Sequence, residues 1–141
     1  KYDGLWQWTL SSEEISSLLE TFGLVRAKSL VCGLPTGCSL DWRWFMRGMW
    51  DGDGSIYVGK RNSARLFSGS LKMLDSCRDV IEEHVGVRCN PSKEKTCSVL
   101  SYQCGSASIV ADWLYSQVGP CCERKRKRAM RVVSGKNNEH A

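Results

Sequence analysis

Two carboxylates stand close together where an apolar segment ends, in Asp51-Gly52-Asp53-Gly54. The preceding segment, from about Asp41 to Trp50, has the composition of a buried helix. The C-terminal end of a helix carries partial negative charge, so an anion there is unfavourable unless a cation neutralises it. Mg²⁺, a hard ion that prefers oxygen ligands, is the natural candidate. The pattern therefore allows a divalent-metal site or an Asp-Gly turn between helix and strand, and taken alone it favours the turn.

The helix that positions these carboxylates is expected to begin at Asp41, which can cap its first turn. Its apolar residues surround most of its circumference and require burial; they are Trp42, Phe45, Met46, Met49 and Trp50. Gly48 is expected to interrupt the helix. Gly48 and Gly52 leave one face without side chains, so a second helix can approach closely, and Gly54 permits a sharp exit into a strand.

The remaining pattern predicts an α+β fold with one antiparallel sheet. Strands are expected near 55–60 and 64–69, joined around Asn62, and again at 87–90 and 96–104. Helices are expected at 71–85, at 107–117 behind a Ser106 cap, and at 123–133. A strand at 5–10 and a helix that Ser11 caps and Gly23 ends precede them. We therefore divide the chain into residues 1–40, like the tail of a preceding repeat, a unit at 41–133, and a frayed tail at 134–141.

Composition narrows the class of protein. A hydrophobic fraction of 42% and a charged fraction of 25% are typical of a globular chain, and no apolar run is long enough to cross a membrane. The eight cysteines lack zinc-ligand spacing, so they are expected to be free, mostly buried thiols of an intracellular protein. The net charge of +5 is mildly basic, and its cations concentrate in the run 124–131. That run is a phosphate-binding segment, a solvated helix face or a nuclear-localisation-like patch.

The segment from Phe45 to Ile56 resembles the motif of the LAGLIDADG homing endonucleases, in the variant with an Arg-Gly pair and Asp-Gly-Asp-Gly-Ser-Ile. Other segments share the resemblance: Gly23-Leu24 before Lys28-Ser29 is similar to the linker before a second motif. Phe67-Ser68-Gly69-Ser70 followed by Leu74 is similar to the strand-to-helix passage after it. Trp113-Leu114-Tyr115 with Arg124-Lys125 is similar to the closing helix and basic segment.

The resemblance implies a homing-endonuclease-like αββαββα unit that binds double-stranded DNA and makes a Mg²⁺-dependent double-strand cut. Asp53 matches the metal-binding catalytic acid, and Asp51 matches a more structural acid of the motif. Lys125 matches a basic residue that helps activate water or stabilises the phosphate, while Ser70 and Lys72 lie near a position that orients water. The motif helix is implied to pack on a second copy through the face that carries Phe45, Gly48, Met49 and Gly52.

DNA contacts are expected from the sheet, because alternation places Ile56 and Val58 toward the helices and their neighbours on the opposite face. That face would lie in the major groove and contact bases or phosphates. The predicted DNA-binding residues are Ser55, Tyr57, Gly59 and Arg61 on the first strand, Arg65, Arg88 and Lys93 extending them, and Arg124 and Lys127 in the basic run.

One motif supplies half of a double-strand cleavage site, so a second motif-bearing half is required. Three arrangements remain open: a homodimer, a C-terminal fragment of a larger protein, or half of a split enzyme with a separate partner chain. The alternative function is a DNA- or RNA-binding protein of the same fold that does not cut, such as a maturase or transcription regulator. The expected setting is a prokaryotic or phage cytoplasm or an organelle, with a role in intron or intein mobility.

Overall fold

The computed structural model describes residues 11–23 and 30–135. Its elements in chain order are α1 (Glu13–Thr21), α2 (Trp42–Asp53), β1 (Gly54–Tyr57), β2 (Ser63–Ser68), α3 (Leu71–Val85), β3 (Ser92–Lys93), β4 (Ser98–Gln103), α4 (Cys104–Tyr115) and α5 (Glu123–Val133). The predicted α+β class and the αββαββα order are confirmed. The strand predicted at 5–10 and the end of the predicted tail lie outside the described residues.

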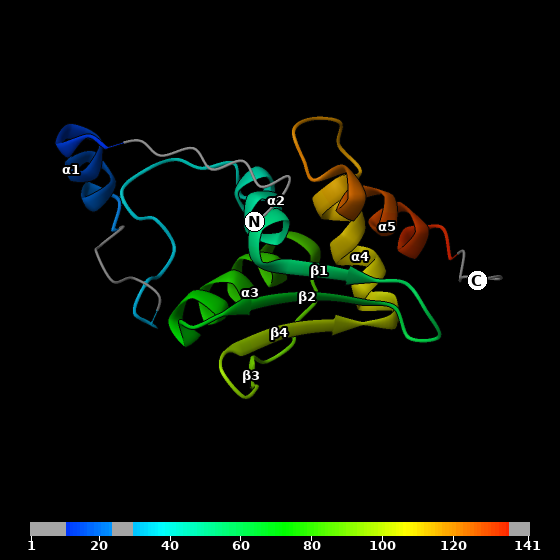
Figure 1. The fold of residues 1–141 in the computed structure, drawn as a ribbon. Coiled ribbons are helices and arrows are strands. Elements are labelled where there is room, and N and C mark those ends of the chain that lie inside the picture. The colour runs from blue at the N-terminus through cyan, green and yellow to red at the C-terminus, as the bar shows by residue number, and fades with distance from the viewer. Residues whose placement is uncertain (1–10, 24–29, 136–141) are drawn as a thin grey trace, which may run out of the picture.

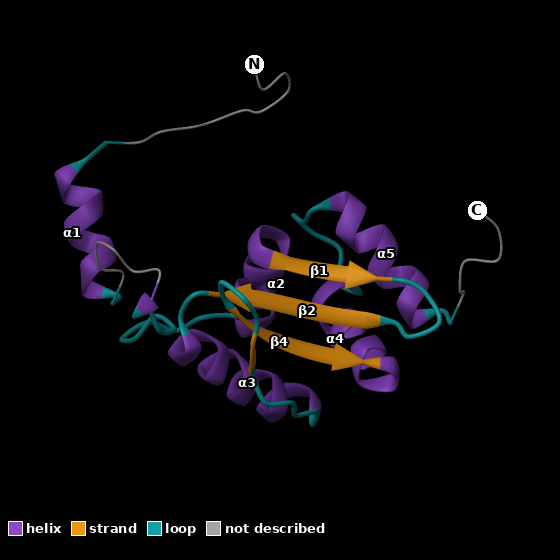
Figure 2. Ribbon diagram, turned by 60° about the horizontal axis from the view of Figure 1, so that its bottom comes forward, coloured by secondary structure: helices purple, strands orange, loops and turns teal. Residues whose placement is uncertain are grey.

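The four strands form one antiparallel sheet in the order β1-β2-β4-β3. Figure 1 shows α2, α4 and α5 on the same side of this sheet, and Figure 2 presents the opposite face in front of them. Alternation explains the two faces, since the core side chains of the strands occur at every second residue. Those side chains are Ile56, Ala64, Leu66, Leu100 and Tyr102, all at most 1% exposed. The sheet therefore has a helix-covered face and an open face.

The motif helix α2 is longer than predicted, because it continues through Gly52 to Asp53. Asp41 is its N-cap as expected, and its carboxylate accepts hydrogen bonds from the amides of Arg43 and Trp44. Gly48 does not interrupt the helix. A glycine costs a helix only about 1 kcal/mol relative to alanine, and burial of neighbouring side chains readily offsets that amount.

Three other local predictions are wrong. Residues 87–90 form no strand, because Val87 and Cys89 pack against the core and the pairing with β4 begins only after Pro91. Ser106 does not cap α4, which begins at Cys104 without a side-chain cap. The cap of α1 is Ser12 rather than Ser11, and its hydroxyl accepts from the amide of Ile15.

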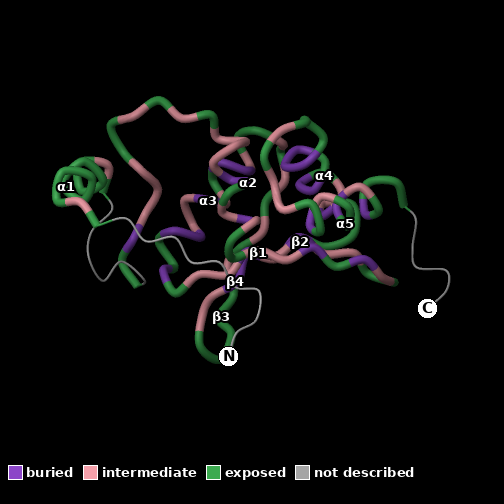
Figure 3. Tube along the Cα trace, turned by 45° about the horizontal axis from the view of Figure 1, so that its top comes forward, coloured by how far each residue is buried: buried purple, intermediate pink, exposed green. Residues whose placement is uncertain are grey.

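The cysteines are free, as expected, but fewer are buried than expected. Only Cys32 and Cys77 are buried, five are half-buried, and Cys104 is exposed. Helix α1 differs from the rest of the fold, since none of its residues is buried (Figure 3). Within the described residues, no helix is long and apolar enough to cross a membrane.

Candidate metal and nucleic-acid site

The inner face of α2 packs into the core through Met46, Arg47 and Trp50, each at most 1% exposed. Arg47 is the unusual member, because a buried cation needs partners. Its Nε donates to the carbonyl of Leu114 at 2.5 Å and its Nη2 to the carbonyl of Gln117 at 2.9 Å. These carbonyls belong to the C-terminal end of α4 and the turn after it, so Arg47 fixes α2 against α4 by capping that end.

Asp51 is held by two donors from outside its own helix. The hydroxyl of Tyr115 donates to one carboxylate oxygen at 2.8 Å, and the amide of Cys122 donates to the other at 2.8 Å. Burial raises the pKa of Tyr115, and the bond to Asp51 and the charge of that carboxylate add to the rise. Asp51 therefore ties the end of α2 to α4 and to the start of α5, which agrees with the structural position that the resemblance implies.

Lys125 lies at the same end of α2, but its ammonium is already engaged. The residue is only 6% exposed, and Nζ donates to the carbonyls of Trp50 at 2.7 Å and of Asp51 at 2.8 Å. A cation at a helix C-terminus neutralises the partial negative charge of the last carbonyls. The sequence placed Lys125 beside the motif but did not reveal that it caps the motif helix.

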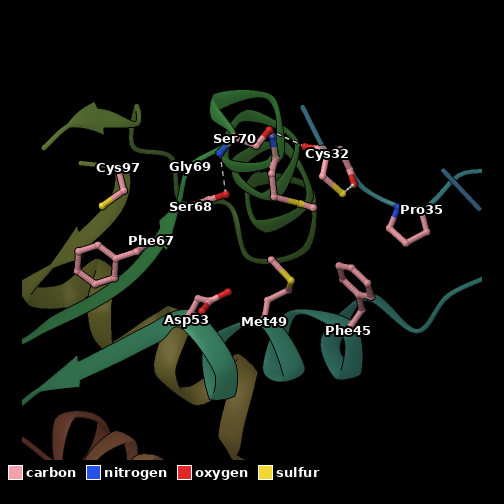
Figure 4. A pocket seen from close by; sticks show the side chains of 12 residues that line it. Cys32, Pro35, Phe45, Met49, Asp53, Phe67, Ser68, Gly69, Ser70 and Cys97 are labelled. Atoms are coloured by element: carbon pink, nitrogen blue, oxygen red, sulfur yellow. Dashed lines mark hydrogen bonds between the residues drawn. The ribbon is translucent and has the colours of Figure 1, made fainter. Parts of the chain in front are cut away.

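Asp53 has the opposite surroundings. It is exposed, and its carboxylate accepts no hydrogen bond from residues 11–23 or 30–135. It lines an open cavity of about 570 Å³ together with Phe45 and Met49 of the same helix. Figure 4 shows these three side chains on one side of the cavity, facing Ser68, Ser70 and the segment that carries Cys32. Among the described residues, Asp53 is thus an unpaired carboxylate beside a mainly apolar cavity.

The predicted helix-pairing face borders the same cavity. Phe45 and Met49 are half-buried, and Gly48 and Gly52 are exposed. A Cβ atom added at either glycine would meet no atom within 4 Å. The outer face of α2 can therefore be approached closely by another helix.

Ser70 and Lys72 are placed less favourably than predicted. The Ser70 hydroxyl is buried; it accepts from the amide of Met73 at 3.2 Å and donates to the carbonyl of Cys32 at 2.6 Å. It caps α3 and holds the segment before α2, so its single O–H donor is already used. Lys72 is exposed, and its side chain runs beside Gly33, where a Cβ atom would lie 3.2 Å from Lys72 Cε. None of its contacts in the described residues joins it to Asp53.

A hard divalent cation fits this site only in part. The free carboxylate of Asp53 is a suitable oxygen ligand. Within the described parts of the chain, however, no three His, Cys, Asp or Glu side chains gather as a metal cluster. One chain supplies an incomplete ligand set, so the remaining ligands would have to come from a second helix end or from the phosphate groups of DNA.

The open face of the sheet gathers several of the predicted DNA-binding residues. Ser55 of β1 and Ser101 of β4 pair across the sheet with Arg65 in the central strand β2. Tyr57 is 59% exposed at the end of β1. Its ring lies over Gly59, where a Cβ atom would be 2.6 Å from the ring. Arg61 is exposed in the following turn.

Two predicted residues lie elsewhere. Arg88 follows α3, outside the strands, and forms ion pairs with Glu82 and Asp79 of that helix. Lys93 pairs with Ser98, which lies on the same side of β4 as Leu100 and Tyr102, whereas Ser101, the partner of Arg65, lies on the opposite side. It is exposed at the sheet edge but does not belong to the row of Arg65.

The basic helix α5 separates its cations onto two faces. The inner face carries Lys125, Ala129 and Val132, which are buried. The outer face carries Arg124, Lys127, Arg128 and Arg131 at helical spacing, all exposed. None of these four forms an ion pair with a described acidic residue. Arg124 and Lys127 therefore present uncompensated charge on the helix that also delivers Lys125 to the end of α2.

Comparison with known families agrees with this geometry. Residues 42–102 match the LAGLIDADG-like domain, from the start of α2 to β4. No curated protein matches the chain. The match covers the free and the held carboxylate, the open sheet face and the helix α3, and it ends before α4 and α5.

Proposed function

Because residues 42–102 belong to the LAGLIDADG family, which includes homing endonucleases and maturases, we propose that this chain cleaves double-stranded DNA. The single observation that carries the proposal is the difference between the two motif carboxylates. Asp51 is held by two donors, whereas Asp53 is exposed without a partner among the described residues and lines the cavity beside the helix-pairing face. The first shapes the helix end, and the second remains available for chemistry.

Phosphodiester hydrolysis needs an activated water and neutralisation of the charge that develops on the phosphate oxygens. Bound at Asp53, Mg²⁺ would supply both by acidifying water and acting as a Lewis acid. The chain's own contribution is to hold the Asp53 carboxylate at a fixed helix end. Lys125, Arg47 and Asp51 accomplish this by fastening α2 to α4 and α5.

A double-strand cut requires two such helix ends. The outer face of α2, with Phe45 and Met49 beside the bare positions of Gly48 and Gly52, offers an apolar seam for a second motif helix. We propose that the partner is a second copy or a separate chain with the other motif. The open sheet face would then lie in the major groove, and the outer face of α5 would contact phosphates.

One observation favours a second candidate, a DNA- or RNA-binding protein that does not cut. The Lys125 ammonium is engaged by two carbonyls, so fewer of its three N–H donors remain for a phosphate or a water. A chain with a free Asp53 but without a free basic group would bind nucleic acid more readily than it hydrolyses it.

The test is incubation of the chain with a randomised duplex library and Mg²⁺, followed by sequencing of bound and cleaved molecules. Wild type is compared with Asp53→Asn and with Asp112→Asn, a matched control at an exposed aspartate of α4. We expect wild type and Asp112→Asn to cleave, and Asp53→Asn to bind without cleaving. If all three bind and none cleaves in any oligomeric state, the nuclease proposal is lost and the binding function stands.

A further inference from the structure

The open face of the sheet holds one arginine that is already paired with an acid. Arg65 lies in the central strand β2, and its Nη2 donates to Glu94 of the turn that joins β3 to β4. The guanidinium also stacks on the ring of Phe67, with Cζ 4.9 Å from the ring centroid. Both side chains stay accessible, with 33% of Arg65 and 43% of Glu94 exposed. The cation is therefore oriented from two sides but not buried.

The neighbours of Arg65 leave space in front of it. Its partners across the sheet, Ser55 and Ser101, have small side chains. The turn that carries Glu94 is closed by a hydrogen bond from the Glu94 amide to the Cys97 carbonyl at 2.8 Å. Figure 2 shows this hairpin in front of one end of the open face, so Glu94 reaches Arg65 across β4, and 33% of the Arg65 side chain stays exposed. An approaching nucleic-acid groove can still meet the guanidinium.

We propose that Arg65 is a specificity-determining residue that recognises guanine, and that Glu94 is its positioning residue. This inference rests on the proposed DNA binding. A guanidinium has five N–H donors in a planar fork, and within the described residues only Nη2 makes a hydrogen bond. The guanidinium of Arg65 therefore keeps N–H donors that can bond two acceptors on the edge of one base. Guanine presents such a pair in the major groove, N7 and O6.

The negative charge of Glu94 determines whether Arg65 contacts a base or a phosphate of the DNA. A phosphate that approached Arg65 would also approach the Glu94 carboxylate, and like charges at short range repel. The guanine edge is neutral and suffers no such repulsion. Because Glu94 and Phe67 restrict the rotamers of Arg65 before binding, less conformational entropy is lost when the base contact forms. The pairing therefore favours base recognition over phosphate contact.

The experiment selects sequences from a randomised duplex library without Mg²⁺, so that binding is measured apart from cleavage. The chains compared are wild type, Arg65→Ala and Glu94→Gln. The matched control is Glu82→Gln, which removes an acid paired with Arg88 outside the sheet. Circular-dichroism melts of all four chains establish that each is folded at the selection temperature.

We expect wild type to select a motif with a position of strong guanine preference. Arg65→Ala should lower that preference about 5- to 150-fold, the range of one bidentate base contact, and leave the other positions unchanged. Glu94→Gln should lower it about 3- to 10-fold while increasing the total amount of DNA retained, because an acid is removed from the DNA-facing surface. Glu82→Gln should change neither.

The outcomes separate this inference from the proposed function. If Arg65→Ala weakens retention of all sequences equally and leaves the motif intact, Arg65 is a phosphate contact and the inference is overturned. If Glu94→Gln increases retention with an unchanged motif, its positioning role is overturned. If folded wild type retains no duplex at all, the proposed DNA function fails and the inference fails with it.

Discussion

The two faces of α2 differ more than their sequence spacing suggests. The inner face is fixed by Arg47 against α4, by Asp51 against α4 and α5, and by Lys125 at its last carbonyls. The outer face has an open seam of Phe45, Gly48, Met49 and Gly52, and it ends in the free carboxylate of Asp53. The inner side of the helix therefore stabilises the fold, and the outer side carries the groups proposed for pairing and chemistry. Substitutions on each side should therefore affect different measurements.

The substitution Asp53→Asn should have the largest effect, a loss of DNA cleavage. Loss of the ionised carboxylate removes the proposed metal ligand, whose catalysis is worth several kcal/mol, so the cleavage rate should fall by about 100-fold or more. The free energy of unfolding should change by less than about 0.5 kcal/mol, since the side chain is exposed. Single-turnover cleavage and urea unfolding measure the two quantities. A loss of stability larger than that would place Asp53 among the structural groups of the inner side.

Lys125→Met should have the largest effect on folding. It removes the donor to two carbonyls at a buried helix end, so the free energy of unfolding should fall by about 2–4 kcal/mol. Urea unfolding checks this value, with Lys127→Met, an exposed residue of the same helix, as the control expected near zero. Cleavage should also weaken more than DNA binding, because the end of α2 moves. Equal loss of cleavage and binding in a fully stable protein would instead make Lys125 a plain phosphate contact.

Asp51→Asn should destabilise the inner side to a smaller extent. The amide can still accept from Tyr115, but its NH₂ group faces the Cys122 amide, so one donor loses its partner. We expect a loss of about 1–3 kcal/mol in the free energy of unfolding. Tyr115→Phe, which removes one of the two bonds, should cost less. Unchanged stability in Asp51→Asn would show that the two bonds do not fasten the helix end.

The smallest expected effect is that of Gly48→Ala. The added methyl group meets no atom within 4 Å in the single chain, and alanine favours a helix by up to about 1 kcal/mol over glycine. The isolated chain should therefore become slightly more stable, while association of two motif helices weakens. Thermal unfolding at low concentration and sedimentation at high concentration measure these separately. A destabilised single chain would show that the outer face is already covered.

The sequence predicted much of this fold because the signals are local. The Asp41 cap and the alternation around Ile56 each depend on neighbours in the chain, and the structure confirms them. The C-terminal end of α2 was predicted too early, because the cap that supports it comes from Lys125 in a distant helix. No local pattern reveals such a partner. The prediction of a strand at 87–90 was wrong for a similar reason, since packing of Val87 and Cys89 on the core outweighed their strand propensity.

Part of the candidate site was also predictable. The resemblance of the motif assigned Asp51 to a structural position and Asp53 to the catalytic one. The contacts of Asp51 agree with its assignment. The tertiary roles of Ser70 and Lys125 could not be predicted, because a hydroxyl or ammonium near a site can equally serve as a cap. The pairing of Arg65 with Glu94 depends on how the β3–β4 turn folds beside β2, which no spacing in the sequence encodes.

The most direct test of the central claim is a Mn²⁺ titration of the isotopically labelled chain, followed by NMR relaxation. Mn²⁺ prefers the same oxygen ligands as Mg²⁺, and it broadens the signals of nearby nuclei. The account predicts that broadening is strongest at the amides of Gly52, Asp53 and Gly54 and is lost in Asp53→Asn. Broadening centred elsewhere, or unchanged in Asp53→Asn, would contradict the assignment of Asp53 as the metal ligand.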